Sequence, residues 1–304
     1  MNPTLFQINN FTFTTFGLFV ALGLLTGTYF IWRLSRIYEI EKEATLDLIF
    51  YTFVVSIIGA RLFFVIFHLS FFDSLSKVVL FNLYPGLSLW GGLVAGFLTL
   101  LLLTKQKNLS FYLIADIAVV GLFIGLSLGS IGCLLGSCQY GVVSNLPISV
   151  NQVGLLDKRF PVQIFYSLFY FLSFLYLWKM CLRFHFEGKI ASIGLIILGL
   201  SNFFLYFYRG DTFRINSFIT VEQVISLLIL VSGTTFFYQR SKRSISKDVS
   251  YFLKIFYDPK IRQRTLLKIA KSWYNQKVFL RVSIIRWRRK LGKKLHVKAN
   301  PSEF

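Results

Sequence analysis

Arg61 is an ionisable residue inside a long apolar stretch of the sequence, residues 46–67. Charged residues are costly in such a stretch and are therefore candidates for function. A guanidinium there can hold a phosphate or a carboxylate with two parallel hydrogen bonds. The alternative is a side chain that only extends to the lipid headgroups. Because the small residues Gly59 and Ala60 beside it are typical of a helix-packing face, we favour an anionic ligand.

The segment from Gly129 to Gly141, GSIGCLLGSCQYG, is the second candidate. An apolar run gives way here to hydroxyls, thiols and an amide, and irregular polar backbone at membrane depth is tolerated only where it is buried in protein or lines a polar cavity. Cys133 and Cys138 could form an outward-facing redox pair. In a regular helix, cysteines five residues apart lie too far from each other for a disulfide, so this alternative requires the helix to break there.

The cysteine pattern as a whole gives no sign of a metal centre. The third cysteine is Cys181, and no spacing is typical of a zinc site or of a disulfide-rich scaffold. We therefore expect no metal and no cofactor.

The composition predicts the elements that must position these residues. Of the 304 residues, 55% are hydrophobic and only 15% are charged, against about 25% charged in an average soluble domain. This excludes an ordinary soluble protein. Seven apolar stretches are each long enough to cross a bilayer, and none contains an internal proline, so we expect an all-α polytopic membrane protein with seven transmembrane helices. The stretches are 14–32, 46–67, 86–103, 111–136, 162–182, 190–208 and 219–238.

The basic residues are distributed unevenly between the two sides of the predicted membrane domain. The connections after the first, third and fifth stretches, together with the C-terminal region, carry 27 of the 33 Lys and Arg residues, and the opposite side carries 5. Because cytoplasmic loops are enriched in Lys and Arg, we expect the N-terminus outside and the C-terminus in the cytoplasm.

The chain divides by composition into a membrane domain, residues 1–239, and a basic tail, residues 240–304. The tail holds 19 basic and 3 acidic residues interleaved with aromatic and aliphatic ones. This pattern is typical of one or two amphipathic helices on anionic lipid headgroups, with a break at Asp258-Pro259. Nucleic-acid binding also suits such a pattern. We favour the membrane surface because the tail follows a transmembrane stretch directly.

Two further features have structural explanations beside functional ones. Asp116, near the inner end of the fourth stretch, could cap a helix or pair with a nearby lysine. The glycines of the third stretch are explained equally well by close helix packing.

The order of several motifs resembles the prolipoprotein diacylglyceryl transferases over roughly residues 1–239. Besides the two candidates above, the resemblance rests on Phe16-Gly17-Leu18, Gly86-Leu87-Ser88-Leu89-Trp90-Gly91-Gly92, Phe160-Pro161-Val162-Gln163, Tyr208-Arg209-Gly210-Asp211 and Thr220-Val221-Glu222-Gln223. The resemblance implies a bacterial inner-membrane transferase of lipoprotein biogenesis. Such an enzyme moves a diacylglyceryl group from phosphatidylglycerol to the cysteine thiol of a lipoprotein signal peptide, and glycerol phosphate leaves.

The resemblance also implies which residues bind the substrates. Arg61 and Arg209 are expected to hold the lipid phosphate, although Arg209 could equally be an interfacial anchor. With the predicted topology, the matched residues lie in the outer half of the membrane and can converge on one cavity. They are Arg61, Ser88, Gly91, Gly92, Gly129, Gly132, Gly141, Gln163 and Arg209.

Most polar residues of the family's active site are replaced, so we assign no catalytic residue. Trp90 stands at the position of the histidine, Ser130 at that of an arginine, and Cys133 and Cys138 at those of an asparagine and an acidic residue; Asn202 and Tyr206 replace an arginine and a glutamate. Three hypotheses stay open: a divergent active transferase, a relative that binds phospholipid or lipoprotein precursors without turnover, and a thiol redox protein that uses Cys133 and Cys138.

Overall fold

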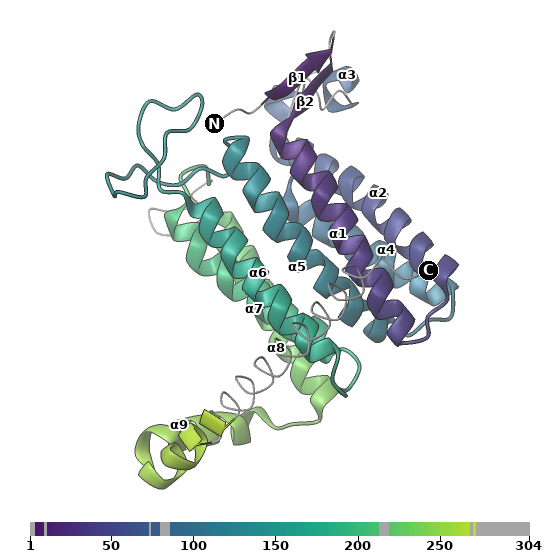
Figure 1. The fold of residues 1–304 in the computed structure, drawn as a ribbon, viewed down its shortest axis with the longest axis vertical. Coiled ribbons are helices and arrows are strands. Elements are labelled where there is room, and N and C mark those ends of the chain that lie inside the picture. Colours follow the sequence, from purple (N-terminus) through teal and green to yellow (C-terminus); the bar gives the residue numbers. More distant parts are fainter. Residues whose placement is uncertain are drawn as a thin grey trace, which may run out of the picture. The chain divides into compact units, whose positions relative to one another are not determined.

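The computed structural model describes residues 4–8, 11–72, 74–79, 86–212, 219–267 and 270–271. The chain forms two compact units, Met1–Ser241 and Lys242–Phe304. Figure 1 shows the first unit as a bundle of long helices.

Seven helices of the first unit are long and apolar enough to cross a membrane, which confirms the predicted multi-pass architecture. Their ends differ from the predicted ones by a few residues, because capping and turn geometry rather than hydropathy set where a helix stops. The helices are α1 (Thr15–Ile37), α2 (Lys42–Phe67), α4 (Leu89–Gln106), α5 (Phe111–Leu135), α6 (Val162–Cys181), α7 (Lys189–Leu205) and α8 (Val221–Ser241). A single 3-10 turn, η2 (Tyr206–Tyr208), extends α7.

A β-hairpin precedes the bundle, and the all-α prediction did not include it. Strand β1 (Thr4–Ile8) pairs antiparallel with β2 (Phe11–Thr14). The alternation of phenylalanine and threonine in β2 fits the two-residue period of a strand. Thr14 then caps α1, since its side chain accepts a hydrogen bond of 3.1 Å from the Gly17 amide. Two short helical segments, η1 (Leu69–Phe71) and α3 (Leu75–Val79), follow α2, and α3 lies at the same end of the bundle as the hairpin (Figure 1).

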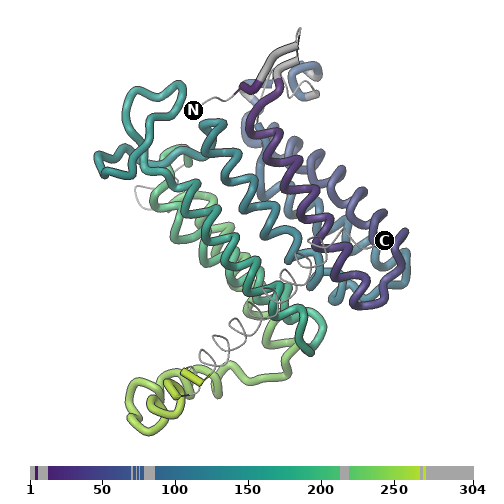
Figure 2. The backbone as a smooth tube through the Cα atoms, viewed as in Figure 1, coloured from purple at the N-terminus to yellow at the C-terminus, as the bar shows by residue number. Residues whose placement is uncertain are grey.

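Helix α5 is the centre of the bundle. The backbone trace shows it between α1 on one side and α6 and α7 on the other (Figure 2). Its residues Ile117, Val120 and Phe123 are almost fully buried and belong to the main apolar core, which also includes Tyr170 and Leu177 of α6. Since most faces of α5 meet protein, its sequence is apolar around most of its circumference rather than amphipathic.

Small residues let the helices approach closely at two interfaces. A Cβ atom on Gly23 of α1 would lie 3.1 Å from the carbonyl oxygen of Gly125 in α5. Between α2 and α4, a Cβ atom on Gly91 would lie 2.7 Å from the Gly59 oxygen, and one on Gly92 would lie 3.3 Å from the oxygen of Ser56. The glycines of α4 therefore serve helix packing of the small-xxx-small kind.

Asp116 in α5 caps a different helix. The carboxylate is completely buried. It accepts hydrogen bonds from the Gly188 amide at 2.8 Å and from the Ala191 amide at 2.7 Å. These groups lie at the start of α7, where backbone amides have no intrahelical partner. The capping interpretation of Asp116 is confirmed, and His185 lies 3.5 Å from the same carboxylate.

Replacing Asp116 with alanine should lower the free energy of unfolding by about 3 kcal/mol, since two buried amides lose their acceptor. The thermal unfolding midpoint in detergent measures the effect. Asp47→Ala is the matched control, because that carboxylate is half exposed and pairs with Lys107. Similar shifts for the two variants would contradict the capping role.

The described part of the second unit contains two helical pieces. Helix α9 (Ile245–Tyr257) ends directly before Asp258-Pro259, and helical structure resumes over 259–267. The predicted break is confirmed, because proline cannot continue the hydrogen-bond ladder of a helix. Four apolar side chains recur at helical spacing along α9 and are all exposed: Val249, Phe252, Leu253 and Phe256.

Candidate functional site

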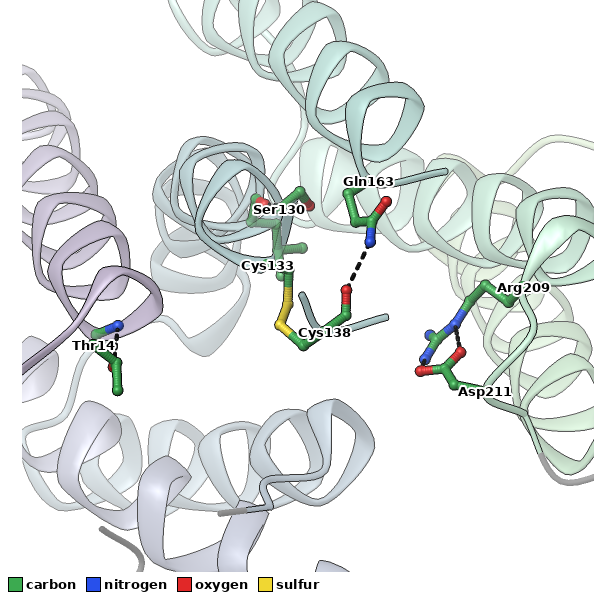
Figure 3. The surroundings of a disulfide bond; sticks show 9 residues. Thr14, Ser130, Cys133, Cys138, Gln163, Arg209 and Asp211 are labelled. Carbon is green, nitrogen blue, oxygen red and sulfur yellow. Dashed lines mark hydrogen bonds and ion pairs between the residues drawn. A yellow bond between two sulfur atoms is a disulfide. The ribbon is translucent and has the colours of Figure 1, made fainter. Parts of the chain in front are cut away.

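Helix α5 ends at the segment that the sequence singles out. The backbone leaves the helix after Leu135, and Ser137 and Gln139 adopt positive φ angles of 59° and 52°. The turn brings Cys133 and Cys138 together, with their Cα atoms 4.8 Å apart and a disulfide between them. The helix break that the redox alternative requires is thus present, and Figure 3 shows the disulfide on the turn.

Gln163 in the first turn of α6 holds this turn in place. Its Nε2 atom donates a hydrogen bond of 2.7 Å to the carbonyl oxygen of Cys138 (Figure 3). The side chain is completely buried, and its Oε1 atom has no hydrogen-bond partner among the described residues. Such a buried acceptor is expected to meet a ligand or a water molecule.

Arg209 follows the turn η2 and is joined to the same loop through the backbone. Gly141 and Arg209 form an isolated β-bridge, and the Gly210 amide donates to the carbonyl of Tyr140 at 2.9 Å. A Cβ atom on Gly210 would lie 2.7 Å from the Gly141 oxygen, so the two chain segments meet only because both positions are glycine.

The Arg209 guanidinium forms a two-bond ion pair with Asp211. Nε and Nη2 each donate to one carboxylate oxygen at 2.8 Å (Figure 3). Its centre lies 4.8 Å from that of the Tyr206 ring. Burial alone would lower the pKa of Arg209, but the hydrogen bonds to Asp211 and the neighbouring Tyr206 and Tyr166 phenols raise it above its usual value. The Arg209 guanidinium therefore stays positively charged, with the Asp211 carboxylate as its partner.

Arg61 is buried and bound to the backbone of its own outer connection. Its exposed fraction is 6%. Nε, Nη1 and Nη2 donate to the carbonyl oxygens of Val78, Gly86 and Lys77, each at 2.9 Å. Arg61 thus fastens α3 and Gly86, which precedes α4, to α2.

Ser88 occupies the start of α4. Its amide donates to the carbonyl of Ala60 at 3.0 Å, and its hydroxyl caps the helix at the Gly91 amide at 3.5 Å. Ser88 and Arg61 together fix the first turn of α4. That turn carries Trp90, which is buried.

Trp90 connects this turn to the region of Arg209. The indole lies beside the Tyr206 hydroxyl, yet its Nε1 atom makes no hydrogen bond of normal geometry among the described residues. The Tyr166 hydroxyl of α6 and the Glu222 Oε2 atom of α8 are likewise buried without a hydrogen-bond partner in the described part of the chain. The sequence analysis did not single out Tyr166, although the spacing of Tyr166 and Tyr170 places two phenols on one helix face.

The two remaining glycines of α5 differ in what they face. A Cβ atom on Gly132 would lie 2.6 Å from the Cβ of Phe19 in α1, whereas one on Gly129 would meet nothing within 4 Å. Gly132 therefore serves packing, and Gly129 borders open space. Of the residues expected to bind substrates, Gly141, Gln163 and Arg209 gather around the disulfide-bonded turn, while Arg61, Ser88, Gly91 and Gly92 form the contact between α2 and α4.

An apolar groove of about 400 Å³ begins beside Gln163. It follows the contact between α5 and α6 over the halves of these helices nearest the disulfide. Leu134 and Gln163 lie at that end, and Ile124 and Phe171 lie near the helix centres. The other lining residues are Ser127, Leu128, Ile131, Ile164, Ser167 and Leu168. An apolar groove with a polar end is suited to an amphiphile.

The fold and the site define a multi-pass membrane protein with a partly buried arginine–carboxylate pair beside a disulfide-bonded turn at one end of the bundle. A model of the prolipoprotein diacylglyceryl transferase family matches residues 3–239. The chain belongs to this family. Its C-terminal basic tail lies beyond the match.

Several phosphatidylglycerol–prolipoprotein diacylglyceryl transferases are similar to this chain. The enzyme of Finegoldia magna is 28% identical over 82% of this chain and 99% of the relative. That of Staphylococcus haemolyticus is 28% identical over 77% and 86%, and that of Clostridium tetani is 26% identical over 77% and 95%.

Proposed function

We propose that this protein transfers a diacylglyceryl group from phosphatidylglycerol to the cysteine of a lipoprotein signal peptide. The observation that carries the proposal is the family match over residues 3–239. In this reaction the thiolate attacks the glyceryl carbon, the carbon–oxygen bond to phosphate breaks, and glycerol phosphate leaves. The chemistry requires a thiolate and groups that stabilise negative charge on the departing phosphate.

Arg209 is our choice for the group that binds the phosphate. The guanidinium is charged and stands beside the Tyr166 and Tyr206 phenols. The Tyr166 hydroxyl and the Trp90 indole are buried donors without a hydrogen-bond partner among the described residues, and phosphate oxygens would accept from both. Trp90 cannot act as a base, so its part in the proposal is to donate a hydrogen bond.

The other candidates take supporting parts. The groove between α5 and α6 would hold an acyl chain, with Gln163 at the polar end. Gly129 would let the lipid approach the backbone, Gly141 would keep the loop close to Phe160 and Tyr208, and Gly132, Gly91 and Gly92 would keep the helices close. Arg61 and Ser88 would position Trp90. Three of the Arg61 donors already serve carbonyl oxygens, whereas two of the Arg209 donors serve Asp211, so we give the phosphate to Arg209 first.

A non-catalytic relative that binds phospholipid or lipoprotein precursors is the second candidate. The replacement of the family's histidine by Trp90, and of two polar residues by a disulfide, favours it. Purified protein in phosphatidylglycerol bilayers should be given a lipobox peptide, and glycerol phosphate release should be followed. Release that requires the peptide's cysteine supports the transferase, whereas bound lipid without release supports the second candidate.

We also propose the cellular setting: the bacterial inner membrane, with the N-terminus outside and the tail on the anionic cytoplasmic leaflet. The distribution of Lys and Arg supports the orientation. The apolar side chains of α9 and the basic residues beside them suit a helix that lies in the headgroup region.

A probe on the apolar side of α9 should enter anionic bilayers. The full chain suits maleimide labelling, since Cys133 and Cys138 are bonded and Cys181 is buried. A fluorophore on Leu253→Cys should be quenched by nitroxide lipids in phosphatidylglycerol vesicles, and much less at high salt. The matched probe on Lys247→Cys, on the opposite side, should stay unquenched. Equal quenching at both positions, or none, would exclude this placement.

A further inference from the structure

The disulfide is the one reactive group of the site that the proposed transfer does not use. It closes a short loop from Cys133, in the last turn of α5, to Cys138 beyond the helix end. Cys133 is buried, with 5% of its surface exposed, whereas Cys138 is partly exposed. An external thiol would therefore reach the sulfur of Cys138 first, since access directs which sulfur is attacked.

The backbone around Cys138 is held in an uncommon conformation. Ser137 and Gln139 on either side have φ angles of 59° and 52°, a region that side chains other than glycine rarely adopt. The bonds that hold this turn include the disulfide, the Gln163 hydrogen bond to the Cys138 carbonyl, the hydrogen bond of 2.9 Å from the Cys138 amide to the Cys133 carbonyl, and the hydrogen bond of 3.1 Å from the Val153 amide to the Ser137 hydroxyl. Opening the disulfide would give the turn room to relax, which favours exchange.

The same loop is continuous with the proposed phosphate site. The carbonyl oxygen of Tyr140, two residues after Cys138, accepts a hydrogen bond from the Gly210 amide. Gly141 forms a β-bridge with Arg209. A thiol bound at Cys138 would therefore stand near the charge that we assign to the lipid phosphate.

We propose that the Cys133–Cys138 disulfide exchanges with the cysteine of the incoming lipoprotein precursor and returns that cysteine as a thiolate. The inference rests on the proposed function, which brings a free thiol to this site. The precursor thiol first loses its proton to water. Its thiolate attacks the Cys138 Sγ atom, a new S–S bond forms, the Cys133–Cys138 bond breaks, and the electron pair leaves on Cys133 Sγ.

The reverse step completes the cycle. The Cys133 thiolate attacks Cys138 Sγ, the enzyme disulfide reforms, and the precursor sulfur leaves as a thiolate beside the lipid. No net oxidation takes place, so no oxidant or reductant is required. A free thiol with a pKa of about 8.5 is only slightly ionised at neutral pH. The exchange supplies no base, since the proton is lost to water before the first attack. It carries the sulfur into the site as a mixed disulfide and releases it there as a thiolate, beside a Trp90 that cannot act as a base.

Exchange can be measured without any lipid transfer. Full-length Cys133→Ala and Cys138→Ala proteins, both with Cys181→Ser, should be mixed with a lipobox peptide whose cysteine carries thionitrobenzoate. Release of yellow thionitrobenzoate reports attack, and mass spectrometry identifies the adduct. We expect the Cys133→Ala protein, with Cys138 free, to react at least about tenfold faster than the Cys138→Ala protein. Equal rates, or no adduct, would overturn the proposal.

A second measurement uses the unaltered protein, so its result does not depend on whether the cysteine variants fold. The oxidised chain is given the free-thiol peptide, quenched with acid and alkylated with N-ethylmaleimide. The expected species carries the peptide on Cys138 and the maleimide on Cys133. Glycerol phosphate release without this species would leave the proposed function standing and reject the exchange. The adduct without release would support the exchange and reject the transfer.

Discussion

Replacing Arg209 with alanine should lower the rate of glycerol phosphate release by about two to three orders of magnitude, the usual cost of losing one preorganised group that stabilises developing negative charge. The guanidinium is the positive charge that we assign to the phosphate, and it pairs with the Asp211 carboxylate. Arg209→Lys should recover only part of the rate, because an ammonium lacks the planar fork that matches a phosphate.

The control for Arg209 removes a positive charge nearby without touching the site. Lys158 is an exposed residue of the connection between α5 and α6. Lys158→Ala should leave the rate within about twofold, since exposed charges contribute little. Release assays on bilayers of the same lipid content compare the variants. If Arg209→Ala and Lys158→Ala release glycerol phosphate equally fast, the phosphate is held elsewhere.

The transmembrane architecture could be predicted from the sequence because a bilayer imposes a strict demand. Every apolar run long enough to span must close its own backbone hydrogen bonds, so hydropathy and length indicate helices such as α5 directly. The break before Pro259 follows as directly, since proline lacks the amide hydrogen. The hairpin β1–β2 was missed because an isolated pair of short strands leaves only a weak period-two signal.

The geometry of the site depends on information that hydropathy lacks. The disulfide exists because α5 ends at Leu135; one more turn of helix would have kept Cys133 and Cys138 apart. Capping was one of two interpretations of Asp116, beside pairing with a lysine, and the sequence did not indicate that the helix would be α7. The phosphate assignment of Arg61 came from its position in a span. Which of its donors meet carbonyl oxygens depends on where α3 and Gly86 lie beside α2, which no local pattern records.

Replacing Arg61 with alanine should lower stability as well as activity. This pair of effects distinguishes an Arg61 that holds backbone carbonyls from one that binds the lipid phosphate. Three charge-assisted hydrogen bonds to the carbonyls of Lys77, Val78 and Gly86 would be lost. Because such bonds contribute about 1.5–3 kcal/mol each and neighbours are not additive, we expect the free energy of unfolding to fall by about 3–5 kcal/mol. Thermal unfolding in detergent without phosphatidylglycerol, and the rate of proteolysis between α2 and α4, measure this effect.

An Arg61 that serves only the lipid phosphate would behave differently. Its replacement would leave the lipid-free unfolding midpoint unchanged and would weaken only the binding of phosphatidylglycerol. If Arg61 instead holds the backbone carbonyls, activity falls because Trp90 loses its position. Arg61→Lys then restores stability only in part, because one ammonium cannot reach three carbonyls in the arrangement of the guanidinium fork. Arg209→Ala, by contrast, should strongly reduce the rate of glycerol phosphate release but only slightly lower the thermal unfolding midpoint of the lipid-free protein. The ratio of the two losses in each variant therefore identifies which arginine supports the fold and which one binds the phosphate.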